Sequence, residues 1–153
     1  MPPSAPAVYD GYYNTTPECW SVYTQVIGAE FGNAVLFGQS HQLTVDTYAV
    51  QHPGGRHPDK SIGIHLSGLH LMLEAGCKPP TVAPLLQRLA GSIHEWPHFV
   101  PPHNRGSISV FDAAMADSPR EHIRLVRAWA EELWRVWSPH HAAVARLLER
   151  HLG

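Results

Sequence analysis

The sequence predicts an all-α protein that folds as one domain, a single-domain helical bundle of five to six helices. Several segments carry apolar side chains at the spacing of a helix face. The chain has 14 prolines and 12 glycines, which separate these segments, and serine, threonine or aspartate precedes most of them. Such residues start and stop helices. A chain of 153 residues also has the size of one domain with one core.

Residues 1–15 are expected to form an extended N-terminal arm because prolines interrupt them, and the helical bundle domain is expected to span residues 16–153. The first helix is predicted to open at Pro17, since proline suits the first helical position. Thr15 or Thr16 can cap it.

The second predicted helix runs from about Val35 to Gln51, and Pro53 with the glycines that follow ends it. The third begins at Asp59, which can cap it, and Gly76 closes it.

A short fourth helix is expected in "PPTVAPLLQRLAGS", closed by Gly91. The long Pro-rich loop of residues 92–107 then separates the fourth and fifth helices. A loop of this length is either flexible or functional. Its Trp96, His98 and Phe99 favour a functional loop.

The segment "SISVFDAAMAD" is ambiguous: Ser109 could cap a short helix, or the segment could be extended. The helix that follows is the clearest in the chain, with Ser118 as cap, Pro119 at the first helical position and Glu121 completing a capping box. A last helix is expected from about Pro139.

Composition excludes several classes of protein. The net charge is −2 and no basic run occurs, so no nucleic-acid partner is expected. No stretch approaches the ~18 apolar residues of a membrane span, and no signal peptide is evident. We therefore expect no membrane association and a cytoplasmic location. Cys19 and Cys77 form no CxxC pair and are expected to be reduced, buried small hydrophobes.

Histidine is the outlier, with twelve residues, roughly three to four times ordinary usage. His41 and His52 lie only ~20° apart around the predicted second helix, and Val45 and Tyr48 share that stripe. The two histidines are about 16 Å apart along the axis, however, so they cannot bind one metal ion. Asp46 points to a different face.

The first functional hypothesis is a buried, histidine-rich site for a divalent metal, zinc or iron, which accept imidazole and carboxylate together. His41, His65 and His141, from separate helices, are the predicted metal ligands, and Asp46 is a fourth ligand or orients one of them. Asp46, Tyr48 and His52 are the predicted catalytic groups. A metal-activated water would then carry out hydrolysis or a related lyase or transferase step.

Two alternatives stay open. The protein could be a non-enzymatic module that binds a small apolar or aromatic molecule between tryptophans, namely Trp96, Trp129, Trp134 and Trp137. It could instead be a helical domain, alone or as a homodimer, whose histidines are structural hydrogen-bonding residues. The roles of His70 and His140 are not assigned, and Glu131 and Glu132 are expected to form a solvated helix face.

Four segments, "CWSVYTQVIGAEF", "HQLTVDTYAVQHPG", "IHLSGLHLMLEAG" and "WAEELWRVWSPHHAAVARLL", resemble an uncharacterised bacterial family, a domain of unknown function. Its members carry an HxLTVDxYAxQHPG segment, and the resemblance covers roughly residues 17–150. It implies no activity. The shared positions it implies are His41, Asp46, Tyr48, Gln51, His52, His65, Trp137 and His141. Many members begin with a CxxCG segment that this chain lacks. At the level of fold alone, metal-binding bundles of the DinB type are an analogy.

Overall fold

The structure is a computed structural model of the chain, and it describes residues 11–153. In this range every regular element is helical. Most of the predicted arm lies outside the described residues, and residues 11–15 form no helix. The elements are α1 (Pro17–Phe31), α2 (Ala34–Leu36), the π-helical turn η1 (Phe37–His41), α3 (Gln42–Gln51), α4 (Asp59–Leu73), α5 (Pro79–Ser92), α6 (Val110–Ala114), α7 (Pro119–Val136), the 3₁₀ turn η2 (Ser138–His140) and α8 (His141–Leu152).

The all-α class is therefore confirmed, but the structure has more helices than the five to six predicted. The predicted second helix begins as α2, widens into the π turn η1 and continues as α3. Single π-helical turns within α-helices are frequent at functional sites. The ambiguous segment after Ser109 forms the short helix α6 and no strand.

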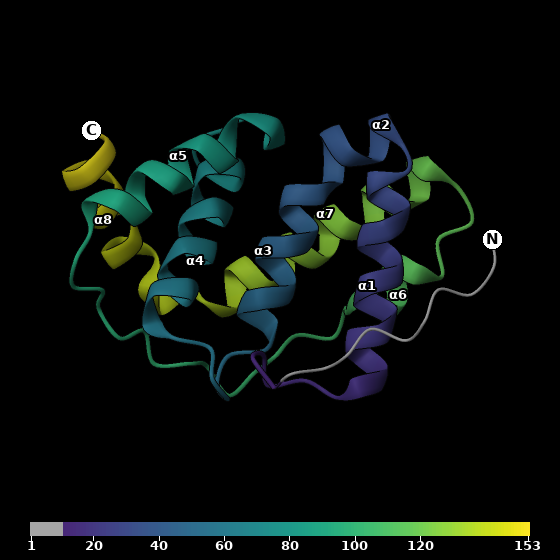
Figure 1. The fold of residues 1–153 in the computed structure, drawn as a ribbon, viewed down its shortest axis with the longest axis horizontal. Coiled ribbons are helices and arrows are strands. Elements are labelled where there is room, and N and C mark those ends of the chain that lie inside the picture. Colours follow the sequence, from purple (N-terminus) through teal and green to yellow (C-terminus); the bar gives the residue numbers. More distant parts are fainter. Residues whose placement is uncertain (1–10) are drawn as a thin grey trace.

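Helix α3 occupies the middle of the molecule, packed against α4 on one side and α7 on another (Figure 1). Helices α1 and α6 lie at one end of the molecule, and α4, α5 and α8 lie at the other. Eight of the ten residues of α3 are buried, and they include Thr44, Asp46, Thr47 and Gln51. A buried polar group is costly without a partner. Thr44, Asp46 and Gln51 make hydrogen bonds with side chains or backbone far away in the chain, whereas the hydroxyl of Thr47 has no partner among residues 11–153.

Several helix starts follow the local sequence signals, but Asp59 does not cap α4 as predicted, since it is the first helical residue and the N-cap position is Pro58. The hydroxyl of Thr16 accepts a hydrogen bond from the Cys19 amide (3.1 Å), and that of Ser118 accepts one from the Glu121 amide (3.1 Å). The predicted capping box at Glu121 is wrong in its second half, because this carboxylate binds the exposed Arg124 instead. A complete capping box forms at α6, between Ser109 and Asp112.

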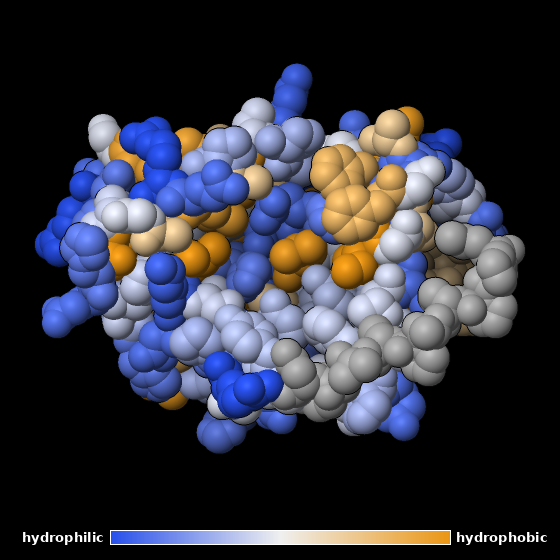
Figure 2. All heavy atoms as spheres, in the orientation of Figure 1, coloured by the Kyte–Doolittle hydropathy of each residue, from blue (hydrophilic) through white to orange (hydrophobic). Residues whose placement is uncertain are grey.

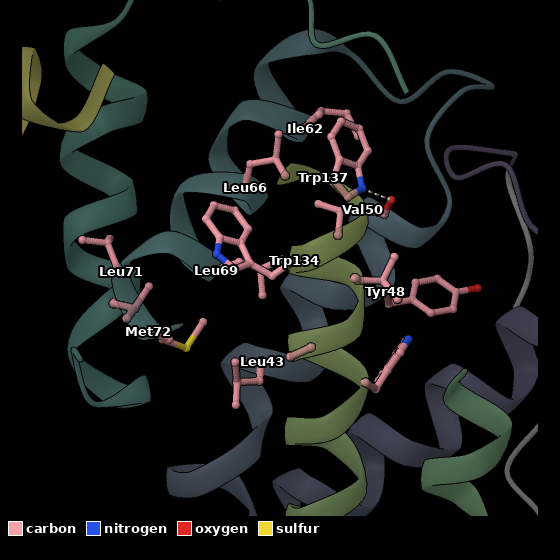
Figure 3. Packing of buried hydrophobic residues seen from close by; sticks show 14 of the residues in the cluster. Leu43, Tyr48, Val50, Ile62, Leu66, Leu69, Leu71, Met72, Trp134 and Trp137 are labelled. Carbon is pink, nitrogen blue, oxygen red and sulfur yellow. Dashed lines mark hydrogen bonds between the residues drawn. The ribbon is translucent and has the colours of Figure 1, made fainter. Parts of the chain in front are cut away.

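The hydrophobic core gathers around the large aromatic side chains of α7 (Figure 3). Trp129 and Trp137 are fully buried, and the indole of Trp137 donates a hydrogen bond to the Val50 carbonyl (3.1 Å). Figure 2 shows hydrophobic side chains at the surface near the junction of α1 and α2, where the exposed Phe31 and Phe37 lie. None of the helices in residues 11–153 is long and apolar enough to cross a membrane.

Candidate functional site: a thiol, an imidazole and a guanidinium in one pocket

A stripe of side chains that begins at His41, at the end of η1, and continues along α3 to His52 faces α1. His41 contacts Glu30, the ring of Tyr48 stacks on Tyr23 (centroids 3.9 Å apart), and His52 contacts Cys19. The two helices therefore run antiparallel, and the stripe of His41, Tyr48 and His52 inferred from helical geometry exists. Its two histidines occupy opposite ends and have different partners.

At the first end, the carboxylate of Glu30 is fully buried and accepts three hydrogen bonds. The donors are Thr44 Oγ1 (2.6 Å), His122 Nε2 (2.8 Å) and His41 Nδ1 (3.1 Å). Burial raises the pKa of Glu30, but these donors outweigh it, so the net pKa is lowered and the group is ionised at neutral pH.

A second buried carboxylate, Asp46, lies on the side of α3 that faces α4. Its oxygens accept hydrogen bonds from His65 Nδ1 (2.7 Å) and from the Gln42 amide (3.0 and 3.1 Å). Complete burial raises the pKa of Asp46, which the His65 contact opposes. Gly68 makes room for this carboxylate, since a Cβ there would lie 2.0 Å from Asp46 Oδ2.

The three predicted metal ligands therefore have three separate partners. His41 binds Glu30, His65 binds Asp46, and His141 donates to the Trp134 carbonyl (2.7 Å). In residues 11–153, no group of three or more His, Cys, Asp or Glu side chains is arranged to hold a metal ion. The shared zinc or iron centre thus gains no support from the described structure.

At the second end of the stripe lies a pocket of about 390 Å³, called here the thiol pocket. It opens between the first turn of α1, the C-terminal end of α3 and the segment before α6. Polar residues that line it include Cys19, His52 and Arg105, and its apolar lining residues are Pro53, Ile108 and Phe111. None of the four tryptophans proposed as pocket walls lines it.

Cys19 and His52 meet at the inner wall of this pocket. Sγ of Cys19 is 3.8 Å from Nε2 of His52. The hydroxyl of Tyr48 lies 2.9 Å from Thr15 Oγ1 and 3.6 Å from the same sulfur, and its one proton can be donated to either of them. Cys19 lies in the first turn of α1.

His52 is held as a neutral base. Burial lowers its pKa to about 4; a hydrogen bond with the backbone of Asn14 opposes this, and the charge of Arg105 adds to it. At neutral pH the imidazole is therefore uncharged, and its Nε2 faces the thiol. A hydrogen-bonded thiol beside an oriented, neutral imidazole is the arrangement that activates cysteine nucleophiles.

The backbone on either side of Arg105 is fixed by two side chains from buried helices. Gln51 donates to the carbonyls of Arg105 (2.9 Å) and Ile108 (2.7 Å), and accepts from Trp129 Nε1 (3.0 Å). Glu132 accepts from the amides of Ser107 (2.7 Å) and Ile108 (2.8 Å). Glu132 is thus partly exposed, in line with the solvated face that the sequence suggested, but its carboxylate also holds the loop backbone.

The guanidinium of Arg105 lacks an acceptor. Its Nη1 is buried and has no hydrogen-bond partner among residues 11–153. Burial also lowers the pKa of Arg105. A buried donor without an acceptor costs free energy, and arginine pairs best with carboxylate or phosphate oxygens. Arg105 thus lines the pocket with a cationic side chain, one nitrogen of which has no hydrogen-bond partner among residues 11–153.

Of the predicted catalytic groups, the structure brings Tyr48 and His52 together, with ring centroids 4.4 Å apart. Asp46 lies apart from them, bound to His65. Sequence reasoning missed Cys19, Arg105 and Glu30. Only the length of the 92–107 loop pointed toward Arg105. The predicted burial of Cys19 in the core is confirmed, but its polar neighbours were not foreseen, and Cys77 is only partly buried.

Fold and site together define an all-helical domain with a small-molecule-sized pocket at the end of its central helix. The chain belongs to the family described as a family of unknown function (DUF5946), whose model matches residues 5–138. No curated protein and no solved structure gives a match.

Proposed function

We propose that this protein binds a small carboxylate-bearing molecule in the thiol pocket, with Arg105 as the anchor for the carboxylate. The observation that carries the proposal is the buried Nη1 of Arg105, which has no acceptor among residues 11–153 although its backbone is fixed on both sides. A ligand carboxylate would supply the missing acceptor in a charge-assisted hydrogen bond.

The remaining walls favour a compact molecule with an apolar body. Pro53, Ile108 and Phe111 give the pocket an apolar part of its lining, and its volume of about 390 Å³ is at the small end of the range for ligand sites. Gln51 and Glu132 hold the Arg105 segment before any ligand arrives, so little ordering entropy opposes binding.

Isothermal titration with benzoate and with benzamide tests the proposal, because the two differ mainly in charge. We expect benzoate to bind and benzamide to bind at least tenfold more weakly. Arg105→Gln should reduce benzoate affinity to the level of benzamide. Arg88→Gln, on the exposed surface of α5, is the matched control and should leave the affinity unchanged.

Inorganic phosphate is the third probe, since the same guanidinium could serve either anion. Binding of phosphate without binding of benzoate would overturn the carboxylate assignment. Equal affinity of wild type and Arg105→Gln for benzoate, or no heat with any of the probes, would overturn the proposal as a whole.

A further inference from the structure

We propose that Cys19 and His52 form a nucleophile and base pair that attacks an electrophilic carbon of the carboxylate-bearing ligand in the thiol pocket. This inference rests on the proposed function for the position of its substrate. The reactivity of the pair itself can be measured independently of that function.

The thiol has an unusual set of neighbours for a buried cysteine. Cys19 is only 7% exposed, yet its sulfur is next to Nε2 of His52 and the hydroxyl of Tyr48, and it borders the pocket. Cys19 belongs to the hydrophobic core cluster, but a cysteine that only fills a core has no polar neighbours at its sulfur. Here the imidazole can accept the thiol proton, and the phenol can donate to the sulfur as negative charge develops.

The pocket also places a substrate on the correct side of the sulfur. Arg105, which would hold the carboxylate, is close enough to His52 for its charge to lower the pKa of the imidazole. The anchor and the nucleophile therefore belong to one small site. A carboxylate held by Arg105 presents its neighbouring carbons to Cys19, which supplies the proximity that a bimolecular attack needs.

The chemical step is a substitution. The sulfur of Cys19 forms a bond to the electrophilic carbon, and the thiol proton passes to Nε2 of His52. The bond between that carbon and its leaving group breaks, and the leaving group departs with the electron pair. His52 then gives the proton to the leaving group or to water, so no oxidant or further reactant is required.

The chain provides its own reference thiol. Cys77, between α4 and α5, is more exposed than Cys19, and no side chain of residues 11–153 makes a hydrogen bond with its sulfur. If exposure alone governs reactivity, Cys77 reacts first. If the pair governs it, the more buried Cys19 reacts first.

The experiment is pulse alkylation of the intact protein with iodoacetamide at pH 6, 7 and 8, with the adducts on Cys19 and Cys77 counted by peptide mass spectrometry. An unassisted thiol reacts as its thiolate, so its rate falls about tenfold for each unit of pH below its pKa. We expect Cys77 to follow this slope, and Cys19 to react faster at pH 6 and to change less than threefold across the range.

Variants separate the components. His52→Gln should slow alkylation of Cys19 at pH 6 at least tenfold and leave Cys77 unchanged, in line with the usual contribution of a general base. His94→Gln, an exposed histidine of the loop, is the control and should change neither rate. A Cys19 rate below that of Cys77 in the wild-type protein would overturn the pair whatever the variants do.

Replacing iodoacetamide by iodoacetate tests the link to the proposed function. The ratio of the iodoacetate rate to the iodoacetamide rate at Cys19 should fall at least fivefold in Arg105→Gln. Fast alkylation of Cys19 with no such fall would uphold the pair and overturn the carboxylate anchor. Slow alkylation of Cys19, together with a fivefold or larger fall of this ratio in Arg105→Gln, would overturn the pair and uphold the carboxylate anchor.

Discussion

The replacement Gly68→Ala tests the packing of α4 against the buried carboxylate of α3. The added Cβ would lie 2.0 Å from Oδ2 and 2.7 Å from Cγ of Asp46, distances that no real contact shows. Asp46 is fully buried, so it can move only by giving up its hydrogen bonds to His65 and Gln42.

Two costs and one gain set the size of the effect. Overpacking of a core costs about 1–3 kcal/mol, and the loss of hydrogen bonds to a buried charge costs about 1.5–3 kcal/mol. The better helix propensity of alanine returns about 1 kcal/mol. The free energy of unfolding should therefore fall by about 1.5–5 kcal/mol.

Urea denaturation followed by circular dichroism provides the measurement, and Gly28→Ala provides the control. Nothing lies within 4 Å of a Cβ at Gly28, in the exposed part of α1, so that variant should be neutral or up to about 1 kcal/mol more stable. The double variant Asp46→Ala with Gly68→Ala should lose less stability than the sum of the single losses. A loss below 1 kcal/mol in Gly68→Ala, or strict additivity with Asp46→Ala, would refute the reasoning.

Two further predictions concern Glu30 with its three hydrogen-bond donors, and the backbone segment at Arg105. Glu30→Gln should lower the free energy of unfolding by about 2–4 kcal/mol at pH 7, because an amide cannot satisfy three donors that face one carboxylate. Since the pKa of Glu30 is lowered by folding, its contribution is complete above the unfolded value near 4.5 and is lost as the pH falls through the folded value. The difference in free energy of unfolding between wild type and Glu30→Gln, measured by urea denaturation, should therefore narrow from pH 6 to pH 3. A difference that stays constant would contradict an ionised Glu30 in the folded protein. Glu131→Gln, at an exposed position on α7, is the control and should cost under about 0.5 kcal/mol. Gly106→Ala should weaken benzoate binding and lower the thermal midpoint, because Gly106 has φ +80° and a Cβ there would lie 2.6 Å from Glu132 Oε1. Unchanged affinity in a calorimetric titration would mean that the fixed Arg105 segment does not matter for binding.

Much of the fold could be predicted because its signals are local. Thr16 and Ser118 cap their helices, and prolines and glycines end them, through contacts within a few residues. The stripe of His41, Tyr48 and His52 also followed from helix geometry alone, and the structure shows it facing α1. Local geometry gave no reason to expect the π turn η1 or the short helix α2.

The functional site was predicted less well because its partners are distant in the chain. Glu30 looks like an exposed residue near the end of α1, and only tertiary packing buries it beneath three donors. Glu132 comes directly after the exposed Glu131 in the sequence of α7. Its carboxylate nevertheless accepts hydrogen bonds from the backbone amides of Ser107 and Ile108. The histidine count suggested a metal because a sequence does not reveal that His41 and His65 each have a carboxylate of their own.

Crystals of the protein grown with benzoate would test the central claim most directly. The account predicts density for the carboxylate within hydrogen-bonding distance of Nη1 of Arg105, with the ring against Ile108 and Phe111 and its edge toward Cys19. Benzoate bound elsewhere, or an Arg105 guanidinium satisfied by an oxygen of the protein itself, would contradict it.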